Sequence, residues 1–192
     1  MKRLGCIWIL LVAFIALWAQ EHSPKHEFRG VWVPTVYNNY YRELSVEQLK
    51  DTLVKQLDAY ANMGINTVIY QVRPEGDALY ASSLEPWSRF LTGEQGVAPE
   101  EDFDPMAFLI QECHKRCMEF HAWINPYRAN TNKKNKLSED NRYYSNRYLY
   151  VSYGNQLLFN PGFPQNREHI VSVVKDIVSR YDIDALHMDD YF

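Results

Sequence analysis

The chain has 192 residues, of which 46% are hydrophobic and 15% aromatic, and its formal net charge is −4. This composition is typical of a globular protein and excludes a disordered or low-complexity chain. The slightly acidic balance argues against a dedicated nucleic-acid-binding protein, which would carry a basic surface.

The first 20 residues differ in kind from the rest. Two basic residues precede a nearly unbroken apolar run over residues 7–18, which is followed by the small residue Ala19. This order is typical of a secretory signal peptide. We therefore predict a signal peptide over 1–19, a short linker over 20–27, and export to the periplasm or cell envelope. The alternative is an uncleaved membrane anchor, which is disfavoured because the run is shorter than the roughly 20 residues of a spanning helix.

The remaining sequence alternates apolar strands with amphipathic helices. The strands are predicted at residues 28–33, 66–72, 118–124 and 185–188, and the helices at 45–63, 104–117 and 164–181. Ser45 with Gln48 forms a capping-box pattern, and Asp104 before Pro105 is a typical helix start. This alternation predicts a parallel α/β sheet.

Two architectures fit this pattern, an eight-stranded barrel and an open doubly wound sheet. Pro34 and Thr35 follow the first strand in place of a Gly-rich phosphate loop, which disfavours a dinucleotide-binding fold. Long polar loops follow the strands, as they do in barrels, and we expect the one at 130–147 to be solvated. We predict a parallel (β/α)₈ TIM barrel domain over 28–192. Because a full barrel takes about 250 residues, we expect only its first four strands here, a half-barrel incomplete at its C-terminus.

Two cysteines, Cys113 and Cys117, lie in a predicted helix close to His114 and His121. Their spacing suits a local disulfide poorly, and the histidines show no recognised metal-ligand spacing. We interpret the cysteines as small helix residues that face the core, and we predict neither a metal nor a cofactor.

Polar and aromatic side chains gather where the predicted strands end. We predict Asp189 and Asp190 as catalytic residues, and as substrate-binding residues Gln71, Arg73, His121, Trp123, Asn125, Tyr127, Arg128 and His187. Aromatic rings stack on the apolar faces of sugars, and glycoside hydrolysis needs two carboxyl groups. Because side chains alternate along a strand, the side chains at positions 187 and 189 share one face. If that face is the barrel interior, the carboxylate lies at the mouth with the imidazole one layer below.

Several of these residues have a structural alternative. Asp189 could cap a following helix or form an ion pair with Arg73, and His121 could be a hydrogen-bonded core histidine. Trp87 could pack within its loop rather than against a sugar. Glu75, like Asp77 in the same loop, is expected to stabilise that loop.

Eight ordered blocks resemble the glycosyl hydrolase-like 10 family, namely residues 28–33, 71–74, 76–80, 85–88, 114–116, 121–128, 160–162 and 189–192. The resemblance implies a (β/α)₈ barrel, export, glycoside hydrolysis and, for some relatives, action on peptidoglycan glycan strands. By analogy with α-amylase-like barrels, it implies that Asp189 is the nucleophile. Ala185 stands where the family usually has Gly. Tyr191 stands where chitinase-like barrels carry an acidic Glu, which argues against substrate-assisted chemistry.

The sequence therefore predicts an exported glycoside hydrolase whose partner is a bacterial or dietary polysaccharide, including peptidoglycan glycan strands. The alternative is a non-catalytic glycan-binding protein of the cell envelope, which needs the aromatic platform but no acid–base pair. A metal-dependent deacetylase or esterase is a third, less favoured reading.

Overall fold

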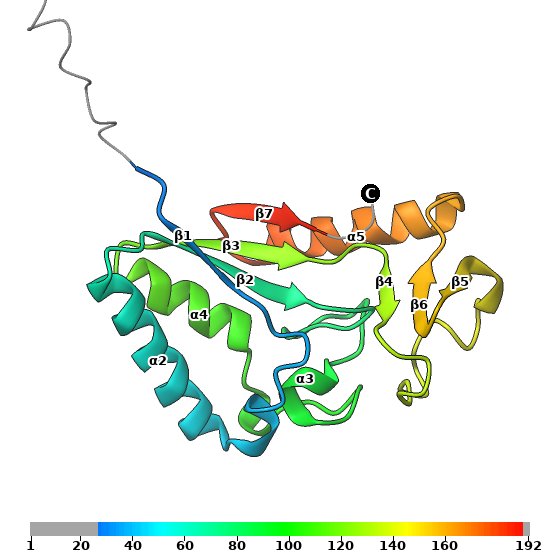
Figure 1. The fold of residues 1–192 in the computed structure, drawn as a ribbon, viewed down its shortest axis with the longest axis horizontal. Helices are drawn as coiled ribbons and strands as arrows, with labels where there is room; N and C mark the ends of the chain where they lie inside the picture. Colours follow the sequence, from blue (N-terminus) through cyan, green and yellow to red (C-terminus); the bar gives the residue numbers. More distant parts are fainter. Residues whose placement is uncertain (1–26, 190–192) are drawn as a thin grey trace, which may run out of the picture.

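The computed structural model describes residues 27–189, so the predicted signal peptide and Asp190 lie outside the described residues. Four parallel strands form the main sheet, in the order β1 (Gly30–Val33), β2 (Thr67–Arg73), β3 (Glu119–Ile124) and β7 (Ala185–Met188). Each neighbour in the sheet follows the previous strand through a helical connection, which gives the topology of a partial (β/α) barrel (Figure 1). The predicted parallel α/β sheet is confirmed.

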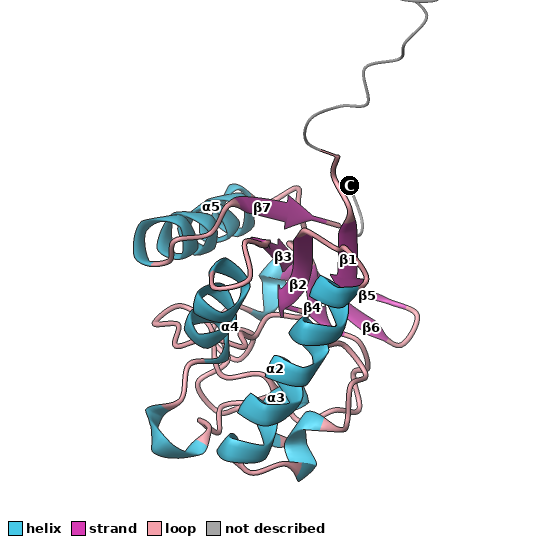
Figure 2. Cartoon of the chain, turned by 90° about the vertical axis from the view of Figure 1, so that its left-hand side faces the viewer, coloured by secondary structure: helices cyan, strands magenta, loops and turns pink. Residues whose placement is uncertain are grey.

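Three long helices cover one face of this sheet, α2 (Val46–Asn62), α4 (Pro105–His114) and α5 (Pro164–Arg180). Figure 2 shows them gathered on the same side of the strands. The predicted capping box at Ser45 is present, and the Asp104 carboxylate accepts a hydrogen bond from the Ala107 amide. None of the helices within residues 27–189 is long and apolar enough to cross a membrane.

Side-chain alternation along the strands separates a helix-facing side from an interior side. The helix-facing side contributes Val68, Tyr70, Val72, Phe120, Ala122 and Ile124 to the main core, together with apolar residues of α2, α4 and α5. The opposite face, called the interior face below, carries Trp32, Ile69, Gln71, His121, Trp123 and His187. The strands are therefore buried by helices on one face only within the described residues.

A second, three-stranded antiparallel sheet lies beyond the carboxyl end of β3. Its strands are β4 (Arg128–Asn130), β5 (Tyr150–Tyr153) and β6 (Gln156–Phe159), and it appears at one end of the molecule in Figure 1. The expectation of a solvated loop at 130–147 is wrong in part, because Asn130 is a buried residue of β4 and Leu137 packs against this sheet. The β4–β6 pairing joins Arg128 to Leu158 and leaves no local periodicity, whereas β5 and β6 form a local hairpin around Gly154 and Asn155 that the sequence prediction missed.

The shorter elements lie in the loops. They are α3 (Arg89–Thr92) and three 3₁₀ turns at Tyr41–Glu43, Glu100–Asp102 and Arg147–Leu149. The main helix of this region, α4, ends at His114, earlier than predicted. Cys113 is buried in the core as predicted, whereas Cys117 is exposed in the following turn with φ of 55°.

Candidate active site

Three aromatic side chains from three strands cluster on the interior face. The ring centroids of Trp32 and Trp123 are 5.2 Å apart, and the His187 ring lies 4.8 Å from Trp32. The Trp123 Nε1 and His187 Nε2 atoms are buried and have no hydrogen-bond partner among the described residues. Trp32 is 51% exposed. The cluster thus combines an accessible aromatic ring with two unused ring nitrogens, which suits a ligand that has both apolar faces and hydroxyl groups.

Buried amides connect the carboxyl ends of all four strands. The Gln71 Oε1 atom accepts hydrogen bonds from the Thr35 and Val36 amides at 2.7 and 2.8 Å. Its Nε2 atom donates to Asn125 Oδ1 at 2.6 Å, and Asn125 Nδ2 donates to the Asp189 carbonyl at 3.2 Å. Both amides are fully buried. Their observed contacts fix the strand ends, and their part in binding sugar stays a prediction.

Arg73 forms a buried ion pair. Its guanidinium contacts Glu85 at 2.5 Å and also donates to the Asn125 carbonyl at 2.6 Å, and the His169 Nε2 atom lies 2.9 Å from the same Glu85 oxygen. Burial alone would raise the pKa of Glu85, but Arg73 and His169 hold that pKa below its usual value. Arg73 is fully buried, and its contacts tie β2 to the following loop and to the end of β3, while Glu85 in turn reaches His169 of α5.

The backbone places Asp189 just past the end of β7. Its amide donates to the Ile124 carbonyl at 3.3 Å, and strand alternation puts it on the same face as His187. It is half-buried and adjoins the Asn125 amide, at the carboxyl edge of the sheet. This is the edge at which barrel enzymes carry their catalytic groups.

The remaining predicted residues lie at different depths. His121 is near the amino end of β3, paired with Ile69, and its Nε2 atom lies 3.0 Å from Glu119. It is therefore two layers below Asn125 rather than at the strand end. Tyr127 and Arg128 have left the main sheet and lead into the second sheet, where Arg128 donates to the Pro74 carbonyl at 3.3 Å.

Two further carboxylates are buried in the loop after β2. Glu75 forms an ion pair with Arg89 at 2.5 Å and accepts a hydrogen bond from the Thr131 amide at 2.6 Å. Burial and the nearby Glu75 charge raise the pKa of Asp77 to about 7. Both acids are fully buried, so their contacts fit the expectation that they stabilise this loop.

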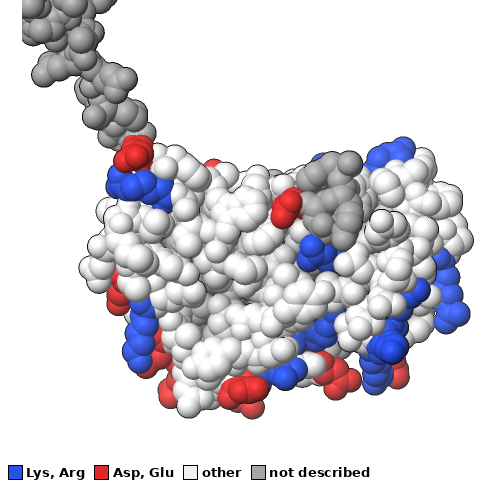
Figure 3. All heavy atoms as spheres, in the orientation of Figure 1, with Lys and Arg blue, Asp and Glu red and all other residues white. Residues whose placement is uncertain are grey.

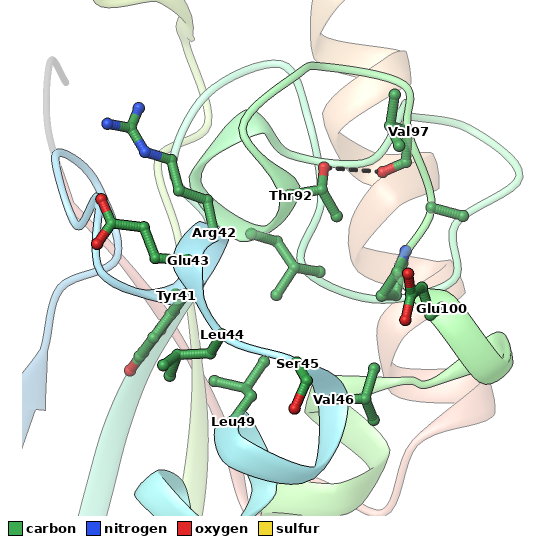
Figure 4. Close-up of a pocket in the computed structure, with 13 residues that line it drawn as sticks. Tyr41, Arg42, Glu43, Leu44, Ser45, Val46, Leu49, Thr92, Val97 and Glu100 are labelled. Atoms are coloured by element: carbon green, nitrogen blue, oxygen red, sulfur yellow. Dashed lines mark hydrogen bonds between the residues drawn. The ribbon is translucent and has the colours of Figure 1, made fainter.

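A cavity of about 410 Å³ lies between the start of α2 and the loop after α3, and Figure 4 shows the residues that line it. Leu44, Val46 and Leu49 line it together with Thr92 and Val97. It belongs to the helix-covered side of the sheet, and none of the predicted site residues lines it. The cavity is therefore separate from the candidate site.

The sequence reasoning missed Trp32, Glu85 and His169. Alternation within the first strand would have placed Trp32 on the face opposite Val31 and Val33, and this signal was available. No pattern pointed to the Glu85–His169 contact, because the two residues are 84 positions apart.

The fold resembles that of TIM-barrel glycosidases. The α-L-fucosidase isoenzyme 2 from Paenibacillus thiaminolyticus matches with a TM-score of 0.55 at 14% identity, over 87% of this chain and 24% of that chain. At this identity the likeness concerns the fold alone. It agrees with the partial barrel described above.

Two curated relatives are more similar in sequence. Glycosyl hydrolase YngK of Bacillus subtilis (strain 168) is 47% identical over 96% of this chain and 36% of its own length. Glycosyl hydrolase DigH of Escherichia coli (strain K12) is 35% identical over 91% of this chain and 44% of its own length. The chain thus spans less than half of either relative. The family model described as glycosyl hydrolase-like 10 matches residues 27–192, and the chain belongs to this family.

Proposed function

We propose that this chain forms part of an exported glycoside hydrolase in which Asp189 is the nucleophile or general base. The observation that carries the proposal is the position of Asp189 at the carboxyl edge of the sheet, in line with His187 and above the aromatic cluster. Trp32 shares this face at the level of His121, two layers below Asn125, so a glycan that stacks on Trp32 would extend from the edge of the sheet into the interior. Export is supported by the sequence of the first 19 residues, and the substrate we favour is a bacterial glycan such as peptidoglycan strands.

Glycoside hydrolysis needs a second carboxyl group. Glu75 and Glu85 are both buried in ion pairs with arginines, and Asp77 is fully buried. These acids are therefore poor candidates, and we propose that the second group is Asp190 or an acid of the whole protein outside this chain.

Replacing Asp189 with Asn in the whole protein tests the proposal. We expect the release of reducing ends from peptidoglycan glycan strands without stem peptides to fall by at least about a thousandfold, because the carboxylate is lost while the size is kept. Asp182→Asn, an exposed change at the other end of β7, is the matched control and should keep full activity. Full activity of the Asp189 variant would remove this residue from the mechanism.

A glycan-binding protein without catalysis is the second candidate. The exposed Trp32 ring and the engagement of the loop acids in ion pairs favour it. Binding of the same strands by the unaltered whole protein, without any release of reducing ends, would support this candidate over the hydrolase.

A further inference from the structure

A second cavity, of about 460 Å³, lies among the loops that follow β1, β2 and β3. It is lined by Tyr37, Asn39, Arg42, Arg89, Phe90, Gly93, Thr131, Asn132, Asn135 and Asn155. These loops leave the carboxyl ends of the strands, which is also the side of Asp189. Its volume falls within the roughly 300–1,000 Å³ typical of small-molecule sites.

The charge in this cavity is positive. Arg42 and Arg89 line it, and no carboxylate does. Glu75 lies behind Arg89 and compensates that charge, whereas Arg42 is exposed and forms no ion pair with any described residue. Arg42 also lines the first cavity, and in Figure 4 its guanidinium is turned away from the other residues drawn there. The Arg89 Nη1 atom is buried without a hydrogen-bond partner in the described part of the chain. Two guanidiniums with unused donors favour an anion.

The uncharged side chains that line the cavity favour a sugar as the molecule that bears the anionic group. The side-chain amides of Asn39 and Asn155 are exposed and make no hydrogen bond within residues 27–189, so they are available to hydroxyl groups. The Tyr37 ring is 67% exposed and stands edge-on to Phe90, with centroids 6.2 Å apart. Tyr37 also has φ of 61°, a left-handed conformation that is strained for a tyrosine and that is often kept at binding sites.

We propose that this cavity binds a carboxylate-bearing sugar unit of the glycan, with the carboxylate on Arg42 and Arg89 and the hydroxyls on the asparagine amides. The proposal rests on the proposed function in taking a glycan as the ligand. It adds that the charged unit of this glycan is held on loops rather than on the interior face. Uronic acids and sugars with a carboxylate on an ether side chain share this chemistry.

Two matched ligand pairs test the proposal on the whole protein. Dissociation constants are measured by ligand-observed NMR for glucuronic acid against glucose, and for N-acetylmuramic acid against N-acetylglucosamine. We expect the acid of at least one pair to bind about tenfold more tightly than its neutral partner, and the pair that responds identifies the source of the carboxylate. Equal binding within both pairs would overturn the proposal.

Substitutions locate the binding. Arg42→Gln should abolish the preference for the acid without changing the affinity for the neutral sugar, and Arg42→Lys should keep part of it. Asn155→Asp, an exposed change of the same size, should also weaken only the acid, because it adds a repelling charge. Lys55→Gln removes an exposed positive charge on α2, away from the cavity, and should change nothing. Unchanged preference in both cavity variants would place the binding elsewhere and overturn the proposal.

Two further outcomes are decisive. If inorganic phosphate displaces the acidic sugar with a similar dissociation constant, the cavity is a plain anion site and the sugar assignment is wrong. The readout needs no hydrolysis, so the two proposals fail separately. If the protein cleaves glycan but shows no preference for the acid, the proposed function stands and this inference is wrong. If it binds the acid through Arg42 but does not cleave glycan, this inference stands and the proposed function is wrong.

Discussion

Single buried side chains hold the carboxyl edge of the sheet together. Gln71 uses its carbonyl oxygen on two backbone amides and its NH₂ group on Asn125, which in turn reaches the backbone of Asp189. Leaving one such buried group without a partner costs about 1–3 kcal/mol. The two amides therefore fix the position of the Asp189 backbone relative to the ends of β1, β2 and β3, and they act as positioning residues.

The raised pKa of Asp77 can be tested through the pH dependence of the protein's stability. Its pKa is raised to about 7 by burial and by Glu75, against an ordinary value of 3.8. The folded state therefore holds the proton more tightly than the unfolded state. The resulting stability is fully present below about pH 4 and is lost as the pH rises through about 7.

We expect Asp77→Asn in the whole protein to be more stable than the unaltered protein at pH 8 by about 1–3 kcal/mol, and to show little gain at pH 4. Urea unfolding at the two pH values measures this difference. Asp140→Asn, an exposed carboxylate in a loop, is the control and should show no such change. An equal effect of Asp77→Asn at both pH values would contradict the raised pKa.

Two of the three long helices, α2 and α4, are capped by a side chain at the N-cap position, and the two caps make different numbers of contacts. Ser45 caps α2 through contacts within its own capping box. Asp104 caps α4 and also accepts hydrogen bonds from the Ala81 amide at 3.1 Å and from the Tyr181 hydroxyl at 2.6 Å. One carboxylate thus joins α4 to the loop after β2 and to the end of α5.

This difference predicts unequal costs of removing the caps. Ser45→Ala should lower the free energy of unfolding by about 1 kcal/mol, and Asp104→Ala by about 2–3 kcal/mol, because two further partners lose their acceptor. Tyr181→Phe removes one of these partners and should fall between the two. Urea unfolding of the three variants is the measurement, and equal losses for Ser45 and Asp104 would show that the outer contacts of Asp104 contribute nothing.

At the scale of the whole molecule, the main sheet has two outer strands, β1 and β7, within the described residues. Helices cover one face, while the other holds the aromatic cluster with its half-exposed Trp32. Figure 3 shows one side of the molecule, where a wide area without charged side chains is bordered by both basic and acidic side chains. Outer strands expose unpaired backbone groups unless they pair with further strands.

Hydrogen exchange can test whether these strands belong to a closed barrel. In the whole protein, we expect the amides of β1 and β7 to exchange as slowly as those of β2 and β3, because closure would pair both outer strands. In the 192-residue chain alone, the outer strands should exchange at least about tenfold faster. Fast exchange of β1 and β7 in the whole protein would argue for an open sheet.

The sequence by itself determined the main strands and helices, their order, and the faces on which their side chains lie. These features depend on spacings of two to four residues and on local caps such as Ser45 and Asp104, which act within one turn. Only the tertiary structure decided that Glu85 pairs with both Arg73 and His169, and that β4 pairs with β6 in a second sheet. Those outcomes depend on groups brought together from distant parts of the chain, and local sequence carries no record of such contacts.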